Sequence, residues 1–333
     1  MPKKQIKQDK SNLPTVSICT ITFNRRPFIP ALIKAIYSQT YPREKLEWII
    51  VDDGTDKIGD LVKDVPFVKY YSFDEKMTIG KKRNFSHEKS TGKILVYMDD
   101  DDYYPPERIE HAVDKLMKGK NLIAGSSELY LYFKELDEMY KFGPYGPNHS
   151  TAATFAFKRE LLKMTSYEEN AALAEEKHFL KEYTIGLTQL DPLKTILVFS
   201  HPQNTFDKKQ LIREESKFVK KSNLKVNNFI KDLELREFYT NTLMKELANY
   251  QAGDVKNKPD VVKQTEEIHK KREQMVIDEQ KKQKSGIVLL DGNGTKQELS
   301  VFDTINFLKQ LQEKNSLLEA ENSQLKQLLM NKS

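Results

Sequence analysis

Apolar runs and amphipathic helical patterns alternate along the first third of the chain. Mostly apolar runs of strand length occupy residues 16–23, 46–51, 68–73 and 94–98, and the first of them is typical of a strand buried on both faces. Apolar residues recur at helical spacing at Phe28, Leu32, Ile33 and Ile36, and at Ile109, Val113, Leu116 and Met117, and a further helix is expected after Gly80. This alternation predicts an α/β fold with a mostly parallel sheet and helices on both faces.

The pattern changes after residue 120. Residues 129–133 and 139–143 favour antiparallel hairpins, residues 168–183 a helix, and residues 195–199 a last strand. From there the chain is helical and heavily charged. We therefore expect a polar tail at 1–13, an α/β domain at 14–205, a charged helical region at 206–285, a linker at 286–304 and a distinct segment at 305–330.

The last segment has a heptad pattern. Its seam positions follow a 3-4-3-4 spacing at Leu308, Leu311, Asn315, Leu318, Asn322, Leu325 and Leu329. Leu at the d positions and Asn at two a positions are typical of a parallel coiled coil, with the buried Asn favouring a dimer. The alternative is an amphipathic helix that packs on its own domain.

Composition narrows the class of protein. The chain has 333 residues and a net charge of +5, which is too mild to indicate nucleic-acid binding by charge alone. Its one cysteine, Cys19, lies in an apolar run, so no internal disulfide can form and a reducing compartment fits. The N-terminus is polar, and no stretch approaches the ~18 apolar residues of a membrane span. We expect a cytoplasmic protein, soluble or peripherally bound to a membrane.

Four consecutive carboxylates, Asp99 to Asp102, follow the apolar run at 94–98. Side chains alternate along an extended chain, so Asp99 and Asp101 point one way and Asp100 and Asp102 the other. Such oxygen ligands suit Mg²⁺ or Mn²⁺ carrying a phosphate. A helix cap with a solvated acidic turn is the alternative, because two prolines follow. A cap needs only one Asp, so we interpret the run as a metal site.

Polar clusters at residues 22–25, 52–55 and 99–102 each follow a predicted strand. In parallel sheets, ligand sites lie at the carboxyl ends of the strands. We therefore expect these three clusters to meet in one site.

The clusters resemble motifs of the family 2 glycosyltransferases, which have the nucleotide-diphospho-sugar (GT-A) fold. The resemblance covers residues 14 to about 205. Its five motifs, in the family's order, are Thr-Ile-Thr-Phe-Asn-Arg at 20–25, Ser-Gln-Thr at 38–40, Val-Asp-Asp-Gly-Thr at 51–55, Gly-Lys-Lys-Arg-Asn at 80–84 and Met-Asp-Asp-Asp-Asp at 98–102. Each motif is weak alone, but five in order are specific.

This resemblance implies a site for a nucleotide-sugar donor, with a UDP-sugar expected. Asp52 would read the uracil edge, and Arg83 would lie beside the base or the diphosphate. Asp99 and Asp101 would hold the ribose and a divalent cation, Mn²⁺ or Mg²⁺. The other residues that the resemblance assigns to the donor are Thr20, Thr22, Asn24, Arg25 and Asp100.

The resemblance also implies a catalytic base. An inverting transferase needs a carboxylate that takes the proton of the acceptor hydroxyl. Glu176 aligns with the family's Asp base and is one methylene longer, so Glu175 stays an alternative. His201 would complete the metal site, its alternative being a surface residue. His149 would line the acceptor or sugar pocket.

We therefore expect an inverting transferase that moves a sugar to a hydroxyl of a glycan, protein or lipid-linked acceptor. A sugar-1-phosphate nucleotidyltransferase would need a glycine-rich loop after the first strand, and residues 24–27 contain no glycine. A coiled-coil DNA-binding dimer would need a basic helix directly before the heptads, and residues 291–294 are Asp-Gly-Asn-Gly. A catalytically degenerate scaffold stays an alternative.

Overall fold

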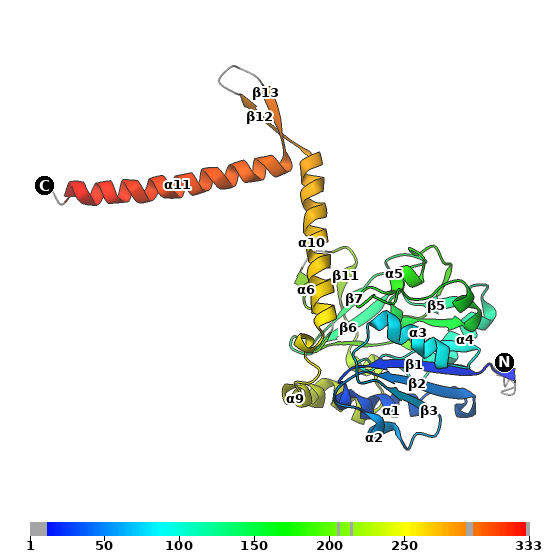
Figure 1. The fold of residues 1–333 in the computed structure, drawn as a ribbon. Coiled ribbons are helices and arrows are strands. Elements are labelled where there is room, and N and C mark those ends of the chain that lie inside the picture. Colours follow the sequence, from blue (N-terminus) through cyan, green and yellow to red (C-terminus); the bar gives the residue numbers. More distant parts are fainter. Residues whose placement is uncertain (1–11, 205–206, 214–215, 291–295, 331–333) are drawn as a thin grey trace. The chain divides into compact units, whose positions relative to one another are not determined.

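The computed structural model describes residues 12–204, 207–213, 216–290 and 296–330, which fall into two compact units, Met1–Val262 and Lys263–Ser333 (Figure 1). The strands of the first unit are β1 (Val16–Thr22), β2 (Leu46–Asp52), β3 (Val68–Ser72), β4 (Ile94–Tyr97), β5 (Ile123–Gly125), β6 (Leu129–Phe133), β7 (Glu138–Phe142), β8 (Ala156–Lys158), β9 (Leu187–Gln189), β10 (Val198–Ser200) and β11 (Val219–Ser222). Its helices are α1 (Ile29–Tyr37), α2 (Gly59–Val62), α3 (Ile79–Lys89), α4 (Arg108–Lys118), α5 (Glu176–Phe179), α6 (Gln210–Arg213), α7 (Val226–Phe229), α8 (Leu233–Glu237), a π-helical turn (Phe238–Thr242) and α9 (Leu243–Ala248).

A seven-stranded sheet in the order β3-β2-β1-β4-β8-β5-β9 forms the centre of this unit. The four strands β3, β2, β1 and β4 run parallel, and β8 is antiparallel to both of its neighbours. The expected mostly parallel α/β sheet is therefore confirmed. Thr22 and Asp52 are register partners, so the polar clusters that follow β1 and β2 start at the same edge of the sheet.

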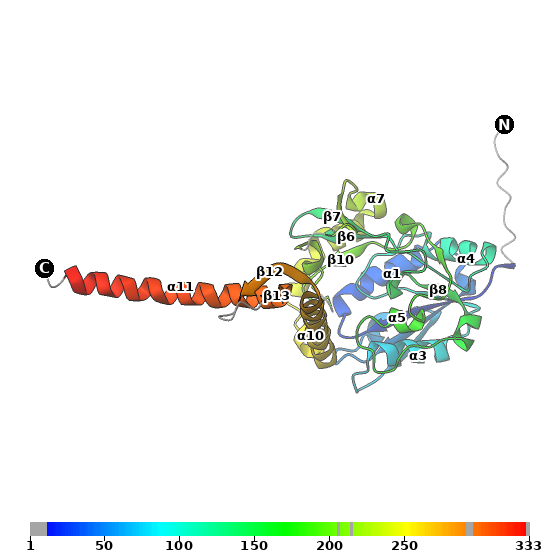
Figure 2. The same cartoon turned by 90° about the horizontal axis from the view of Figure 1, so that it is seen from above.

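Helices cover both faces of the sheet, as the sequence predicted (Figures 1 and 2). Ile18, Ile50 and Val96 face one side, where they pack in one core with α1 and α4. Their neighbours along the strands point to the other side, where His87 of α3 stacks on Tyr97. This two-sided burial explains why β1, β2 and β4 are mostly apolar rather than alternating in pattern.

A second sheet, in the order β10-β6-β7-β11, flanks the first. The expected hairpin is confirmed, since β6 and β7 pair antiparallel. Aromatic side chains of this sheet pack against the helices that follow it: Phe199 of β10 stacks on Tyr239, and Tyr130 of β6 contacts Phe229 of α7. Residues 207–262 therefore belong to the compact first unit, although their charge had suggested a separate helical region.

The helix expected over residues 168–183 is a single turn, α5. Backbone groups upstream of it are used by α3 instead: Gly80 N donates to Ala171 O at 3.0 Å, and Thr78 donates its hydroxyl proton to Glu169 O. Ala174 has a φ of +54°, and positive φ recurs from Lys181 to Tyr183. These left-handed residues end the helical path on both sides of α5.

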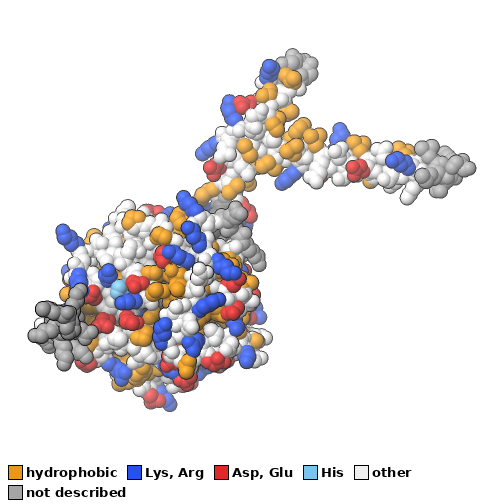
Figure 3. Space-filling view, turned by 180° about the vertical axis from the view of Figure 1, so that it is seen from behind, with side chains coloured by type: hydrophobic (Ala, Val, Ile, Leu, Met, Phe, Trp, Pro, Cys, Tyr) orange, Lys and Arg blue, Asp and Glu red, His pale blue; other side chains and the backbone are white. Residues whose placement is uncertain are grey.

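In the second unit, a β-hairpin stands where a linker was expected. β12 (Lys284–Leu290) pairs antiparallel with β13 (Lys296–Ser300), and residues 291–295 lie outside the described part of the chain. The long helix α10 (Pro259–Lys282) leads into this unit, and α11 (Val301–Met330) ends it. Of the heptad leucines, Leu308, Leu311, Leu318 and Leu325 are 45–57% exposed, and the side chain of Leu329 lies outside the description. Figure 3 shows apolar side chains gathered on the hairpin and along the first part of α11.

No helix among the described residues is both long enough and apolar enough to cross a membrane.

Candidate active site

The acidic run begins where β4 ends and is held at both ends. Asp99 N donates to the Tyr104 hydroxyl at 2.7 Å. At the other end, Asp102 Oδ1 accepts a hydrogen bond from Phe199 N at 3.1 Å, and the Tyr239 hydroxyl donates to Asp102 O at 2.9 Å. Burial raises the pKa of Asp102 well above its ordinary value. Asp102 therefore anchors the run to β10, and the other three carboxylates are left for a ligand.

Asp99, Asp100 and Asp101 line a pocket at the carboxyl ends of β1 and β4. Cationic side chains line the same pocket, namely Arg25, Lys76, Lys82, Arg83 and Lys258. A site that mixes carboxylates with cations can hold a divalent ion and an anionic group side by side.

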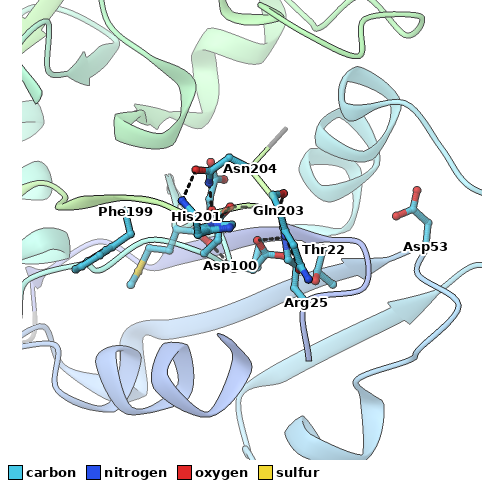
Figure 4. A network of polar contacts seen from close by, with 12 residues as sticks. Thr22, Arg25, Asp53, Asp100, Phe199, His201, Gln203 and Asn204 are labelled. Atoms are coloured by element: carbon cyan, nitrogen blue, oxygen red, sulfur yellow. Dashed lines mark hydrogen bonds and ion pairs between the residues drawn. The ribbon is translucent and has the colours of Figure 1, made fainter. Parts of the chain in front are cut away.

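The loop after β10 contacts the residues of this pocket (Figure 4). Arg25 donates from Nη2 to Gln203 O at 2.7 Å and from Nη1 to Gln203 Oε1 at 3.2 Å. The same guanidinium lies 3.4 Å from Asp101 Oδ2 and 3.8 Å from Asp100 Oδ1. Arg25 thus joins the loop after β1, the acidic run and the loop after β10.

His201 lies beside Asp101, with Nε2 3.2 Å from Asp101 Oδ2. Burial lowers the pKa of His201 to about 4, so its imidazole is neutral at pH 7. Asn204 Oδ1 accepts from His201 N at 2.8 Å, which directs the Asn204 amide nitrogen to His201 Nε2 at 2.7 Å. Nε2 thus lies within hydrogen-bond distance of both an amide nitrogen and a carboxylate oxygen, and a neutral ring can bond to only one of them through Nε2.

The carboxylates of the run have different pKa values. Burial would raise the pKa of Asp101, but His201 and the charge of Arg25 hold it well below its ordinary value. Burial and the adjacent Asp101 charge raise the pKa of Asp100 to about 7. Burial also raises the pKa of Asp99 against the opposing charge of Arg83, and Asp99 Oδ1 is buried without a hydrogen bond. These buried oxygens fit a divalent cation, which would stabilise their ionised forms.

The three predicted metal ligands are only partly brought together. Asp101 and His201 are in contact, whereas Asp99 Oδ1 lies 3.5 Å from Arg83 Nη1. Among the described residues, no three His, Cys, Asp or Glu side chains are grouped as a complete metal centre.

Arg83 connects the acidic run to the predicted catalytic pair. Its Nε donates to Glu175 Oε1 at 2.9 Å, and its guanidinium stacks 4.5 Å from the Tyr97 ring centre. Glu175 is therefore buried in an ion pair. The adjacent Glu176 forms no salt bridge with a described residue, and burial together with the Glu175 charge raises its pKa to about 7. Of the two carboxylates, Glu176 is the one not bound by a cation.

Two residues assigned to the donor, Thr20 and Asn24, are occupied within the protein instead. The Thr20 hydroxyl donates to Met98 O at 2.7 Å and accepts from Trp48 Nε1 at 2.9 Å. Asn24, in the left-handed region with φ +53°, accepts from Asp56 N at 2.9 Å and donates to Ala252 O at 3.0 Å. These two side chains stabilise the sheet and the loop after β1.

Asp52 has a similar internal role. Its carboxylate accepts hydrogen bonds from Gly54 N at 2.9 Å, Ile58 N at 3.0 Å and the Tyr70 hydroxyl at 2.6 Å. It does not line the pocket. The tight-turn interpretation of Asp52 therefore describes its contacts, and the structure gives it no free oxygen edge for a base.

Sequence reasoning passed over several residues in and beside the pocket. Gln203 and Asn204 stand in a polar cluster directly after β10, the same signal that marked the loops after β1 and β2. Lys82, which forms an ion pair with Asp53 at 2.7 Å, lies inside a motif already singled out for Arg83. Lys258 belongs to a charged stretch that had looked like solvated helix, and nothing in the sequence marked it.

His149 lies outside this pocket. Its ring stacks on Tyr183 at 5.0 Å and contacts Tyr145 at 4.8 Å, which makes a small aromatic cluster. The Ser-Gln-Thr motif is structural: Gln39 donates to Pro105 O at 2.9 Å and accepts from Ile109 N at 3.1 Å, so it fixes the start of α4 directly behind the acidic run.

Comparison with known proteins gives concordant relatives. Residues 17–169 match the family model "Glycosyl transferase family 2". Glycosyltransferase AglE of Haloferax volcanii is 31% identical over 127 residues, which is 35% of this chain and 41% of that protein. A putative teichuronic acid biosynthesis glycosyltransferase, TuaG of Bacillus subtilis, is 26% identical over 115 residues, covering 32% of this chain and 43% of TuaG. The chain thus spans about two fifths of the length of these two relatives.

Among solved structures, the mannosyltransferase PcManGT from Pyrobaculum calidifontis, in complex with GDP-Man and Mn²⁺, aligns with a TM-score of 0.47 and 19% identity, over 62% of this chain and 67% of that one. Residues 1–349 of TarS from S. aureus, in complex with UDP-GlcNAc, align with a TM-score of 0.44 and 18% identity, over 56% and 59%.

Proposed function

We propose that the protein transfers a sugar from a nucleotide-diphosphate donor to an acceptor hydroxyl. The proposal starts from its membership of glycosyl transferase family 2, through the domain at residues 17–169. The observation that carries the proposal is the pocket that joins Asp99, Asp100 and Asp101 with Arg25 and Arg83. Such a donor contains a diphosphate, whose charge needs both a cation and fixed positive side chains. The family's relatives named above support the same reaction class.

A divalent cation, Mn²⁺ or Mg²⁺, belongs to this proposal. Asp101 and His201 would hold it, and Asp99 would join them once the donor is bound, because its buried oxygen has no hydrogen bond. The bound cation would neutralise charge on the departing diphosphate. Arg25 keeps Asp101 ionised and holds the loop that carries His201.

Glu176 is the proposed catalytic base. A base must be ionised near the working pH and free to reach the acceptor hydroxyl. Its pKa of about 7 and its lack of a salt bridge with described residues support this role. Glu175 is the weaker choice, because its ion pair with Arg83 stabilises its charge and occupies an oxygen. A base on the side opposite the diphosphate would give inversion at the anomeric carbon.

The donor is proposed to be a UDP-sugar, and the test must include other nucleotides because Asp52 is occupied within the protein. The full chain would be incubated with UDP-, GDP-, ADP-, CDP- and dTDP-sugars in Mn²⁺, and released nucleoside diphosphate would be measured. We expect release from one nucleotide class, loss of it in EDTA, and a sugar product of inverted anomeric configuration by NMR.

Two outcomes would contradict the proposal. A folded protein that releases no nucleoside diphosphate from any donor, in Mn²⁺ or Mg²⁺, would indicate a degenerate scaffold. Release of pyrophosphate from a nucleoside triphosphate and a sugar 1-phosphate would indicate a nucleotidyltransferase instead.

We further propose that α11 pairs with a second copy of the chain. The d-position leucines Leu311, Leu318 and Leu325 lie 45–57% exposed along one helix, which leaves an apolar seam without a partner in the described residues of a single chain. Asn at two a positions favours a dimer.

A further inference from the structure

The segment at residues 250–262, here called the strap, runs beside the pocket although it lies far beyond the family-2 match. Lys258 and Val261 of the strap line the pocket. The strap is tied to the loop after β1, where Asn24 Nδ2 donates to Ala252 O at 3.0 Å and the Tyr250 hydroxyl donates to Asp56 at 2.9 Å. It is therefore part of the same compact unit as the acidic run.

A glycine lets the strap lie directly against the loops that follow β1 and β10. A Cβ on Gly253 would lie 2.1 Å from Gln203 Oε1 and 2.8 Å from Asn24 O. Gln203 also donates from Nε2 to Tyr250 O. At its other end the strap reaches the far wall of the pocket, where Asp260 forms an ion pair with Lys76 at 2.6 Å. These contacts fix the strap on both sides of Lys258.

Lys258 differs from the other cations of the pocket. Arg25, Lys76, Lys82 and Arg83 each have an acidic partner within 4 Å. The Lys258 ammonium has no hydrogen bond or ion pair with any described residue, yet Lys258 is only 5% exposed. Burial and the Arg25 charge lower its pKa to about 7. A largely buried lysine side chain whose ammonium has no partner in the protein can pair with an anionic ligand in the pocket that it lines.

We propose that the strap completes the donor site and that Lys258 binds the diphosphate of the nucleotide. This inference rests on the proposed function, since it assumes a donor in this pocket. An ammonium suits the task because it presents a compact positive charge to phosphate oxygens. Asp100 and Asp101, which are among the charges that act on Lys258, mark the place where the cation and diphosphate would meet.

The test is calorimetric titration of the full chain in Mn²⁺ with nucleoside diphosphates and with the matching nucleosides. Lys258→Met should weaken binding of the diphosphate about tenfold or more and leave binding of the nucleoside unchanged. Lys258→Arg should recover part of the loss. Lys245→Met is the control, since this lysine is exposed and lies outside the strap, and it should bind like the wild type.

A second variant tests the strap itself. Gly253→Ala should also weaken diphosphate binding, because the added Cβ displaces the strap from Gln203. Circular dichroism melting of each variant reports whether the fold is kept.

Each contrary result has one meaning. Unchanged diphosphate affinity in a folded Lys258→Met variant would overturn the inference, and so would equal loss for nucleoside and diphosphate. A change in Mn²⁺ affinity alone would show that Lys258 only balances the acidic run. If the wild type bound no nucleoside diphosphate at all, the proposed function would fail, and the inference with it.

Discussion

At the scale of single residues, two adjacent carboxylates lie in different environments although they belong to the same short turn. Glu175 is paired with Arg83 at 2.9 Å, whereas Glu176 has no salt bridge with a described residue and a pKa of about 7. Neighbouring carboxyl groups with separated environments are typical of sites that use one group for proton transfer and the other for charge balance. Glu176 therefore has the properties of the base, and Glu175 those of a positioning residue for Arg83.

Replacing Glu176 by Gln should lower the rate of sugar transfer about 10²–10⁴-fold, because the amide cannot accept the acceptor's proton. Donor affinity should stay near the wild-type value, since the residue forms no salt bridge with Arg83. The measurement is kcat for transfer together with the Kd for the nucleoside diphosphate. Glu175→Gln is the matched comparison, and it should weaken donor binding by releasing Arg83. Full activity of Glu176→Gln beside an inactive but donor-binding Glu175→Gln would reverse the two roles.

The pH profile gives an independent measure of the same base. Because burial raises the pKa of Glu176 to about 7, the protonated and inactive form should dominate below that pH. We expect kcat/KM to rise with pH through about 7 and then level off. The residual activity of Glu176→Gln should lack this acidic limb, and an unchanged limb in that variant would assign the titration to another group.

At the scale of elements, the strand ends were predictable and the exact partners of their side chains were not. Buried parallel strands leave a clear apolar signal, so β1, β2 and β4 follow from sequence, and the polar ends of β1 and β4 meet in the pocket as predicted. Asp52 was assigned to the donor, but turn geometry decides its contacts: the chain reverses at Gly54 and brings two backbone N–H groups onto its carboxylate. Sequence spacing does not contain that information.

The elements that sequence reasoning missed have a common physical reason. Residues 168–183 have helical spacing, yet tertiary hydrogen bonds to α3 take the backbone groups that a helix would need. The hairpin β12–β13 was missed because its two strands are mostly exposed and so carry no buried apolar face. The strap has no periodic pattern at all, and its relation to the pocket comes from contacts more than 200 residues apart along the chain, such as Asn24 with Ala252.

Asp52→Ala tests whether this residue serves the turn or the donor. Removing three hydrogen bonds from a buried carboxylate should lower the free energy of unfolding by about 3 kcal/mol, measured by denaturant titration. Nucleoside affinity at low temperature, where the variant stays folded, should change little. The exposed Asp64→Ala variant is the control. If Asp52→Ala kept wild-type stability but lost uridine binding, Asp52 would be assigned to the uracil edge of the donor.

At the scale of the whole molecule, the site and the seam lie in different units. Every residue proposed for chemistry belongs to Met1–Val262, and the heptad seam lies in Lys263–Ser333. The seam carries Leu and Asn and no group suited to catalysis. Oligomer formation and sugar transfer should therefore be separable by mutation.

Removing residues 301–333 should halve the mass measured by light scattering and leave donor hydrolysis nearly unchanged. The matched full-length variant Leu311→Lys/Leu318→Lys places charges in the seam and should have the same effect on mass. A truncated chain that keeps its full oligomeric mass would show that other surfaces make the contacts. Lost hydrolysis in a truncated but folded chain would show that α11 contributes to the site.

The central claim is that the acidic run binds a divalent cation together with the diphosphate of a nucleotide. The most direct measurement is the electron paramagnetic resonance signal of free Mn²⁺, titrated with the full chain and the nucleoside diphosphate that its best donor releases. The wild type and the exposed-site control Asp64→Asn should reduce the free signal well beyond what the nucleotide alone does, and Asp101→Asn should not. A free Mn²⁺ signal that is the same with and without wild-type protein would contradict the account.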